Sequence, residues 1–440
     1  MKKRILAFLL AAFILIAFSG CQGVTFNVTE LMSPPKATGE KALIQNLIEE
    51  EAGPGYTLKY PQNGNYRSAI TTMDIDADET EEAIAFYLPA GETQTVHLLI
   101  MDIVDKEWTV IGNHISLSST VDRLEFADMD GDGTKEVVVG WSTYNTLIND
   151  LCVYLVEDGS TREIISKTKY SNLLCDDFTN NGKDELLLIS LYTTDNPASA
   201  SLISLNDTKN SVYPLGQTEI DADTVSFSQL LTGNIAKNQY GAVLDGVTST
   251  GSFNTQILYY DKQLSQLCRI HFTEDKPTNQ AVRNYNVLST DIDDDGIIEV
   301  PNTFKMNIEE TQTESVPAAL IYWCEYGTDG SVSIDDTTAC SLIYGFYFSI
   351  PDSWGKDYTA YINYSTNEII FYEWTEKNTP GETLLILKMF PHEKWNEGTS
   401  SAGYTELTQN DSYVYAFITP ESNSEKIMSN DEVISAFSLI

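Results

Sequence analysis

The stretch DMDGDGTKEVVVG, residues 128–140, sets three aspartates at alternate positions before a glycine, a glutamate and a run of valines. Counted from Asp128, the aspartates stand at positions 1, 3 and 5, the glycine at position 6 and the glutamate at position 9. Side chains at alternate positions of a tight loop converge, and carboxylate oxygens are the ligands that hard cations such as Ca2+ prefer. Glycine at position 6 permits the left-handed backbone that keeps such a loop closed. The stretch therefore predicts a cation loop that leads directly into a β-strand.

Three further stretches repeat this pattern: DIDADETEEAIAF from residue 74, DFTNNGKDELLLI from residue 177 and DIDDDGIIEV from residue 291. We name the four the 74, 128, 177 and 291 loops. An EF-hand has a glutamate at position 12 and a helix after it, whereas here the carboxylate stands at position 9 and a strand follows, so these are not EF-hands. The expected ligands are Asp74, Asp76, Asp78 and Glu82; Asp128, Asp130, Asp132 and Glu136; Asp177, Thr179, Asn181 and Glu185; and Asp291, Asp293, Asp295 and Glu299.

Two interpretations of these loops are open. Acidic turns with solvated side chains would explain one such loop, but four loops at regular spacing favour bound Ca2+. The 128 and 291 loops are complete, and we expect them to bind most strongly. In the 74 loop Glu79 replaces the glycine, which costs about 1 kcal/mol if that residue is left-handed. In the 177 loop Thr179 and Asn181 remove two charges, so we expect it to be the weakest.

The spacing of the loops defines a repeat. Their first residues are separated by 54, 49 and 114 residues, and the last interval is twice 57. A loop is therefore missing near residue 234. Aligning GAVLDG there with EVVVGW puts Gly233, Ile235 and Lys237 at positions 1, 3 and 5, so the unit is retained without its ligands. This gives five units of roughly 50 to 57 residues, a period typical of repeat architectures.

Each unit contains four strand-like runs. In the second unit these are RLEFAD, EVVVGWS, LCVYLVE and REIISKT, which are rich in β-branched residues and are separated by turn residues. Four-stranded units that repeat at this period predict a β-propeller. The expected fold class is mainly β, with a five-bladed β-propeller at residues 56–340 followed by a small α+β domain at residues 341–440.

The D-x-D-x-D-G-x-x-E loop followed by a strand resembles the FG-GAP or VCBS repeat of calcium-binding propellers. The resemblance covers about residues 60–340. It implies a propeller fold with Ca2+ in the loops. Members of this family are mostly surface recognition and adhesion modules, so the resemblance does not imply one particular activity.

The first 21 residues are expected to be a signal peptide. A basic start at residues 2–4 precedes an apolar run at residues 5–18, which is short for a transmembrane span. The small residues before Cys21 resemble the lipobox of bacterial lipoproteins. The resemblance implies that Cys21 is lipidated and anchors the chain to the outer face of the cytoplasmic membrane, at the bacterial cell surface. The alternative is a plain secretion signal with an incidental cysteine.

Residues 22–55 are expected to form a tether and a short helix. The tether holds prolines and glycines and few large apolar residues. The helix is predicted at residues 41–51, with Leu43, Leu47 and Ile48 on its inner face and Gly53 at its end.

Composition limits the class of protein. The chain of 440 residues is 42% apolar and 11% aromatic, enough for a sizeable core, and its net charge is −38. Such a charge excludes nucleic acid as a charge-driven partner and attracts divalent cations. Five cysteines follow Cys21, and their spacing shows no C-x-x-C pair. Most are expected in the core, with a Cys152–Cys175 disulfide as an alternative.

The C-terminal hundred residues contain strand-like runs and end in MSNDEVISAFSLI, residues 428–440, which predicts a helix. Ser429 is its expected N-cap, and Glu432 completes a capping box. Trp354, Trp374 and Trp395 form either a ligand shelf or part of the core.

No nucleophile elbow, histidine-based zinc motif or phosphate loop stands in the sequence, and the four histidines lie far apart. The sequence therefore favours a non-catalytic, calcium-stabilised, surface-anchored lipoprotein that binds a protein or glycan partner. One alternative is a secreted carbohydrate-active hydrolase, because a propeller channel can hold two carboxylates. Another is an accessory subunit of an envelope complex.

Overall fold

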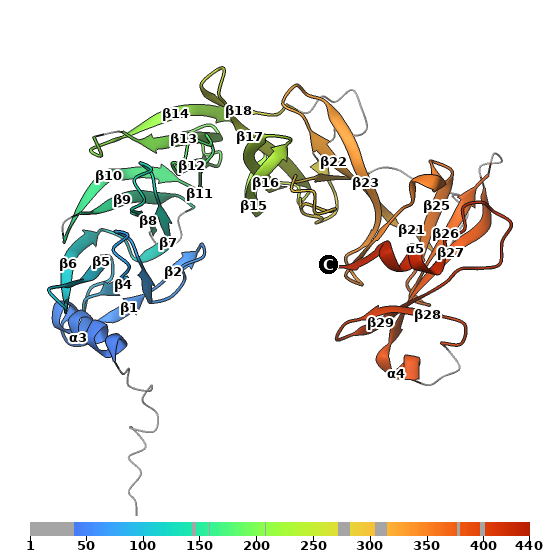
Figure 1. Ribbon diagram of the computed structural model, residues 1–440, viewed down its shortest axis with the longest axis horizontal. Coiled ribbons are helices and arrows are strands. Elements are labelled where there is room, and N and C mark those ends of the chain that lie inside the picture. Colours follow the sequence, from blue (N-terminus) through green and yellow to red (C-terminus); the bar gives the residue numbers. More distant parts are fainter. Residues whose placement is uncertain are drawn as a thin grey trace, which may run out of the picture.

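The computed structural model of the chain describes residues 39–142, 147–157, 159–206, 208–271, 282–303, 315–375, 379–396 and 401–440. Strands dominate these residues and form six sheets that follow one another around an open arc (Figure 1). The expected signal peptide with Cys21, and the tether up to residue 38, lie outside the described residues. In the described part of the chain, no helix is long and apolar enough to cross a membrane.

The first three sheets each contain four antiparallel strands that neighbour one another in chain order. The first sheet contains β3 (Ile70–Met73), β4 (Glu82–Leu88), β5 (Val96–Val104) and β6 (Glu107–Ser116), with β1 (Thr57–Lys59) also beside β4. The second contains β7 (Thr120–Ala127), β8 (Glu136–Ser142), β9 (Asn149–Glu157) and β10 (Ser160–Tyr170), with β2 (Pro61–Asn63) parallel to β7. The third contains β11 (Asn172–Asp176), β12 (Glu185–Ser190), β13 (Ser199–Leu205) and β14 (Val212–Glu219).

The fourth sheet occupies the position where the spacing predicts a unit without ligands. It contains β15 (Thr224–Ala236), β16 (Gln239–Thr248), β17 (Phe253–Asp261) and β18 (Gln266–Arg269), with β19 (Val282–Arg283) beside β17. Here a tight turn at Lys237 and Asn238 joins the first two strands, and Asn238 has a φ of 60°. A continuous hairpin thus replaces the acidic loop.

The fifth sheet departs from four strands in order. It contains β20 (Val300–Thr303), β22 (Ala319–Tyr326), β23 (Val332–Ser341), β24 (Phe346–Ser349) and β30 (Phe437–Leu439). Its expected first strand is reduced to one bridge, between Thr290 and Glu299. The sheet takes β24 and β30 from beyond residue 341, so strands from both sides of the expected domain boundary pair in it.

The sixth sheet forms the C-terminal region. It contains β21 (Val316–Pro317), β25 (Tyr358–Asn363), β26 (Glu368–Trp374), β27 (Pro380–Pro391), β28 (Thr405–Gln409) and β29 (Tyr413–Ile418). Three short helical segments accompany it: η2 (Asp352–Trp354), α4 (His392–Asn396) and α5 (Asn430–Ser435). The Ser429–Glu432 capping box at the start of α5 is confirmed. The prediction that this helix continues to the C-terminus was wrong, because residues 437–439 pair with β24 instead.

Trp354 belongs to the core of this region. It is fully buried, and its indole N–H donates to the carbonyl of Lys426 at 2.7 Å. Trp395 packs against Phe390, at the other end of the sheet. Because Trp354 is enclosed, the three tryptophans do not form a ligand shelf.

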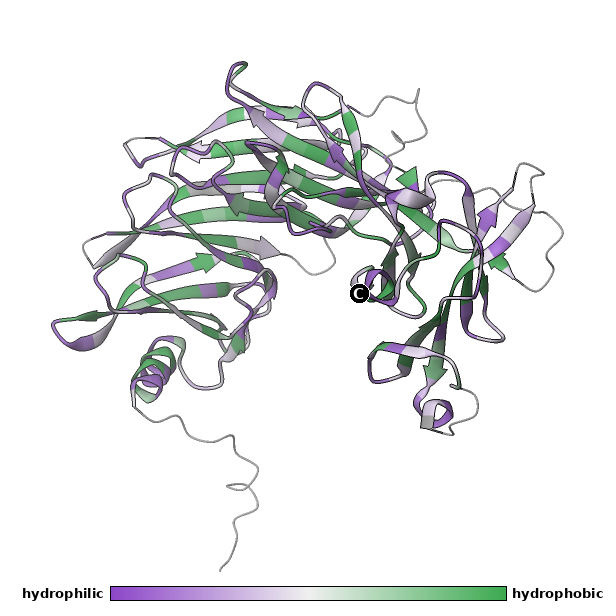
Figure 2. Ribbon diagram, turned by 45° about the vertical axis from the view of Figure 1, so that its right-hand side comes forward, coloured by the Kyte–Doolittle hydropathy of each residue, from purple (hydrophilic) through white to green (hydrophobic). Residues whose placement is uncertain are grey.

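Consecutive sheets pack face to face, and each pair shares a hydrophobic core. Figure 2 shows the apolar residues gathered on the strands and the hydrophilic ones in the connecting turns. The five cysteines are within the described residues and form no disulfide there. Cys152, Cys324 and Cys340 are buried, as expected for core residues.

Helix α3 (Glu40–Ala52) covers the outer face of the first sheet. Alternate residues of β4 point to opposite faces. Ile84 and Phe86 pack toward the second sheet, whereas Ala85 and Tyr87 pack against Ile48 of α3. In a closed propeller this outer face would meet the last sheet. Within the described residues the hydrophobic cluster on this face contains no residue of the fifth or sixth sheet, so the expected closed ring is not formed there (Figure 1).

The inner face of α3 differs from the prediction at one residue. Ile44 and Ile48, four residues apart, are buried, whereas Leu43 is 52% exposed. Leu43 lies about 100° around the helix from Ile44 and so points away from the sheet. The helix ends before Gly53, which has a φ of 72°, as the sequence predicts.

A buried ion pair within the fourth sheet anchors the segment that begins the fifth unit. Arg283 and Asp245 are both almost fully buried and lie 2.9 Å apart. Asp245 also accepts hydrogen bonds from the backbone N–H and hydroxyl of Ser289, at 2.7 and 2.9 Å. These bonds fix the segment that leads into the 291 loop.

Candidate metal-binding loops

The four acidic loops have the same backbone geometry. In each, the carboxylate at position 1 accepts the backbone N–H of position 6, and the side-chain oxygen at position 5 accepts the N–H of position 7. In the 128 loop these distances are 2.9 Å, from Gly133 N to Asp128, and 2.9 Å, from Thr134 N to Asp132. In the 291 loop they are both 2.8 Å. The side chains at positions 1, 3 and 5 are thereby held close together, and the three aspartates converge to within 4.8 Å in the 74, 128 and 291 loops.

Positions 4 and 6 are left-handed in all four loops, a conformation that glycine adopts with least strain. Position 6 is glycine in three loops, with φ between 82° and 93°, and Glu79 in the 74 loop, with φ of 71°. Position 4 is Gly131 in the 128 loop, but Ala77, Asn180 and Asp294 in the others. The strain predicted at Glu79 is therefore present.

The glutamate at position 9 is the centre of each loop. Glu82, Glu185 and Glu299 are fully buried and Glu136 is 2% exposed. One carboxylate oxygen accepts a backbone N–H from the loop's start: from Ile75 at 2.6 Å, Met129 at 2.8 Å, Thr179 at 3.1 Å and Ile292 at 2.8 Å. The glutamate stands at the start of the next strand, or one residue before it. By bonding to the first residues of the loop, its side chain closes the loop.

Burial raises the pKa of these glutamates, because a charged carboxylate is poorly solvated there. The pKa of Glu82, Glu136 and Glu299 rises to about 7, and that of Glu185 to about 6. Neighbouring aspartates add to the rise in each case. Each loop therefore holds an anion whose charge needs compensation, and the loops differ in what supplies it.

The 74 and 291 loops lack that compensation. The second carboxylate oxygen of Glu82, that of Glu299, and one oxygen of Asp74 are buried without a hydrogen-bond partner. Within the described residues no lysine, arginine or histidine lies within 4.0 Å of the carboxylates of these two loops.

Two further carboxylates, which the sequence pattern did not indicate, lie beside these open loops. Asp102 of β5 is buried and raises the pKa of Glu82. Asp335 of β23 interacts with Asp293, and its own pKa is raised by partial burial and by the nearby aspartates. Unpartnered buried oxygens facing several carboxylates fit a divalent cation with oxygen ligands.

The 177 loop satisfies its glutamate with neutral groups. The Thr179 hydroxyl donates to the second carboxylate oxygen of Glu185 at 2.8 Å, and the Asn181 amide lies 3.4 Å from the same oxygen. The two residues that remove charge from the loop are thus hydrogen-bond donors to Glu185. This loop needs a cation least.

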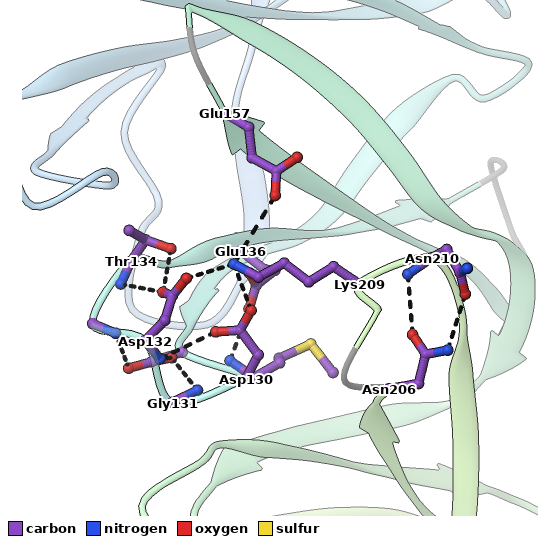
Figure 3. A network of polar contacts seen from close by, with 12 residues as sticks. Asp130, Gly131, Asp132, Thr134, Glu136, Glu157, Asn206, Lys209 and Asn210 are labelled. Carbon is purple, nitrogen blue, oxygen red and sulfur yellow. Dashed lines mark hydrogen bonds and ion pairs between the residues drawn. The ribbon is translucent and has the colours of Figure 1, made fainter.

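The 128 loop contains an ammonium group of the chain itself (Figure 3). Lys209 Nζ lies 2.7 Å from Asp130, 2.5 Å from Asp132 and 4.0 Å from Glu157. Burial would lower the pKa of Lys209, but its hydrogen bonds to the two aspartates outweigh this and raise it. The hydrogen bonds from Lys209 and Thr134 hold the pKa of Asp132 well below its usual range.

The loops are also joined to one another. The backbone N–H at position 8 donates to a carbonyl at position 1 or 2 of the preceding loop or hairpin: Lys135 to Ile75 (2.7 Å), Asp184 to Asp128 (2.8 Å) and Ile298 to Asn234 (2.9 Å). The last of these bonds includes the fourth unit in the row, at Asn234. The third and fourth sheets are joined instead by the hydroxyls of Thr232 and Tyr240, which donate to Asp176 at 2.5 and 2.7 Å. The loops therefore lie in a row along one edge of the sheets.

The histidines form no common group within the described residues. His97 bonds Tyr87 at 3.1 Å, His114 bonds Thr161 at 2.7 Å, and His392 bonds a backbone carbonyl at 2.7 Å. Each of these three is occupied by a local partner, and His271 is exposed.

Comparison with known proteins adds little. No family model matches the chain, and no curated protein matches it. Among solved structures it is similar to Saccharomyces cerevisiae Sqt1, with 9% identity, coverage of 78% of this chain and 93% of that chain, and a TM-score of 0.32. It is also similar to the Dos1 propeller (12% identity, 83% and 88% coverage, TM-score 0.30) and to the exotype rhamnogalacturonan lyase YesX (12%, 70% and 62%, 0.27). These TM-scores are too low to support an argument about fold or activity.

The strain at Glu79 gives a stability prediction. Glu79→Gly is expected to stabilise the fold by about 1 kcal/mol, because glycine adopts the left-handed conformation without the steric penalty. Thermal unfolding should show a rise in Tm of a few degrees. Glu81→Gly is the matched control, since it removes the same charge from an exposed residue without positive φ. If both variants shift Tm equally, the effect comes from charge and not from the backbone.

The buried glutamates predict a pH dependence of the metal-free protein. In the unfolded chain a glutamate titrates near 4.5, and in the folded loops at about 6 to 7. The folded state therefore binds more protons between these values, and its stability is lost as the pH rises through them. In the presence of chelator, Tm should fall from about pH 5 to about pH 7, and Glu299→Gln should make this fall shallower than Glu81→Gln does. A slope that Glu299→Gln leaves unchanged would assign the pH dependence to other groups.

Proposed function

We propose that the protein is a non-catalytic, calcium-stabilised binding protein, with Ca2+ held in the 74 and 291 loops. The observation that carries this is the pair of buried, unpartnered carboxylate oxygens of Glu82 and Glu299, each beside three converging aspartates. A buried anion without a partner is costly, and a divalent cation with oxygen ligands removes that cost. The ligands would be Asp74, Asp76, Asp78 and Glu82 in one loop, and Asp291, Asp293, Asp295 and Glu299 in the other.

We propose further that the five sheets are blades of a propeller-like array. This is supported by the four-stranded repeat, the shared cores between consecutive sheets and the row of loops at one edge. The array is open, because α3 occupies the outer face of the first sheet. Rigid sheets with their connections displayed on two edges suit recognition of a protein or glycan partner.

We also propose that the chain is anchored to the outer face of the membrane through lipid on Cys21. The support is the basic start, the short apolar run and the small residues before Cys21. A surface location agrees with the calcium proposal, because Ca2+ outside the cell is abundant enough to fill weak sites.

The calcium proposal predicts a thermal shift. For a dissociation constant of roughly 0.1 to 1 mM, Ca2+ at ten times that value stabilises the fold by about 1.4 kcal/mol per site. The full chain should melt several degrees higher in calcium than in chelator. Mg2+ should do less, because it requires near-octahedral geometry and retains its waters.

Variants locate the sites. Asp76→Asn and Asp293→Asn should each remove part of the shift and one site in titration calorimetry. Lys237→Ala is the control, because Lys237 is exposed in the hairpin that replaces the missing loop. Equal melting in chelator and in millimolar calcium, with no heat of binding, would leave the acidic loops as solvated turns.

The anchoring proposal predicts the behaviour of Cys21→Ser. The natural chain should partition into the detergent phase, and the variant into the aqueous phase, because one residue carries the lipid. Mass spectrometry of the N-terminus identifies the acyl group. A natural chain that stays in the aqueous phase contradicts the lipoprotein proposal.

A further inference from the structure

Lys209 reaches the 128 loop from a different sheet. It lies between β13 and β14 of the third sheet, whereas Asp130 and Asp132 lie between β7 and β8 of the second. Its ammonium bridges the aspartates at positions 3 and 5, at 2.7 and 2.5 Å. These are two of the three side chains that converge in this loop, so the ammonium takes the place of a cation there (Figure 3).

The turn that carries Lys209 is held in place by its own hydrogen bonds. Asn206 is the organising residue: its side-chain oxygen accepts the backbone N–H of Asn210 at 3.0 Å and of Ser211 at 3.3 Å. Its carbonyl accepts the N–H of Lys209 at 2.9 Å, and Lys209 itself has a φ of 50°. The side chain is 27% exposed, and that of Asp130 only 6%. The contact thus joins a hydrogen-bonded turn to the 128 loop and is partly shielded from solvent.

The corresponding turn in the second sheet, which follows the sheet of the 74 loop, is much shorter. Only residues 158 and 159 stand between β9 and β10, whereas residues 206–211 join β13 to β14. The longer turn brings a lysine to the preceding loop. This lysine places its ammonium within 4.0 Å of two carboxylates of the 128 loop.

We propose that Lys209 is a built-in counter-ion that closes the 128 loop to calcium. Ca2+ must displace the ammonium from Asp130 and Asp132, because the ammonium occupies one oxygen of each carboxylate and repels a second cation placed at the same site. The 128 loop is therefore held together in the absence of metal, while the 74 and 291 loops depend on it. This inference rests on the proposed calcium binding of the latter two loops, and it reverses the expectation that the complete 128 loop binds most strongly.

The test isolates the 128 loop in the full chain. Asp76→Asn combined with Asp293→Asn disables the two open loops, and Lys209→Met is then added to this background. Titration calorimetry with calcium chloride should find little binding to the double variant and one new site in the triple variant. The dissociation constant of that site should be at least tenfold lower than that of any residual binding to the double variant. Lys209→Arg keeps the positive charge and should leave the loop closed. Lys237→Met, which removes a lysine from the exposed hairpin turn, should also add no site.

Thermal melts supply a readout that needs no metal. In chelator, Lys209→Met should lower Tm, because it leaves Asp130 buried without its cation, and Asp130→Asn should restore part of the loss in the Lys209→Met chain. Lys237→Met should not lower it. A melt of the triple variant itself shows whether it is folded, so that its calorimetry can be compared with that of the double variant.

The outcomes separate this inference from the proposed function. If the double variant already binds calcium as tightly as the triple variant, through a site that Asp130→Asn removes, Lys209 does not close the loop and the inference is overturned. It is overturned equally if Lys209→Met gains no site. If the natural chain binds no calcium but Lys209→Met gains one site, the role of the 74 and 291 loops is overturned while that of Lys209 stands.

Discussion

A buried carboxylate at the start of the second strand is the constraint around which each acidic loop is built. One of its oxygens fixes the loop by accepting a backbone N–H, as Glu136 does from Met129 at 2.8 Å. In the 177 loop the other oxygen accepts from the side chains at positions 3 and 5, Thr179 and Asn181. A buried anion requires hydrogen-bond donors or a cation. The residue types at positions 3 and 5 therefore depend on which of these two groups stabilises the glutamate.

The sheets meet this requirement in different ways. The 177 loop supplies the neutral donors Thr179 and Asn181, and the 128 loop receives the ammonium of Lys209. The 74 and 291 loops leave buried oxygens unpartnered, which is why we propose calcium there. In the fourth sheet Gly241 stands where the glutamate would be, and the loop is reduced to a hairpin turn. Because no buried carboxylate stands at this position, no loop residues are needed to stabilise one.

The sequence predicted what is local and periodic. It predicted the loop positions, the strand that follows each loop, the unit near residue 234 and the Ser429 capping box, because each depends on residues close together in the chain. It missed Lys209, which lies 77 residues from Asp132, since the only signal was a lysine in an asparagine-rich turn. It also missed the pairing of β30 with β24, because a short apolar run after a capped helix reads as its continuation. Closure of the ring depends on which surface covers the first sheet, and the isolated pattern of α3 does not contain that information.

An open array of sheets is stabilised mainly by contacts between neighbours, so its stability is approximately a sum over successive interfaces. The position-8 hydrogen bonds cross three of these interfaces: Lys135 to Ile75 joins the first sheet to the second, Asp184 to Asp128 joins the second to the third, and Ile298 to Asn234 joins the fourth to the fifth. The 74 loop therefore lies at the first interface of the array, and the 291 loop at the interface between the fourth and fifth sheets. The 128 loop takes part in the first and second interfaces, and the 177 loop in the second. End units of a linear array open most readily, because opening them breaks the fewest contacts. On this argument calcium in the 74 loop would matter most for the first sheet, which is an end unit of the array, whereas calcium in the 291 loop would stabilise an internal interface.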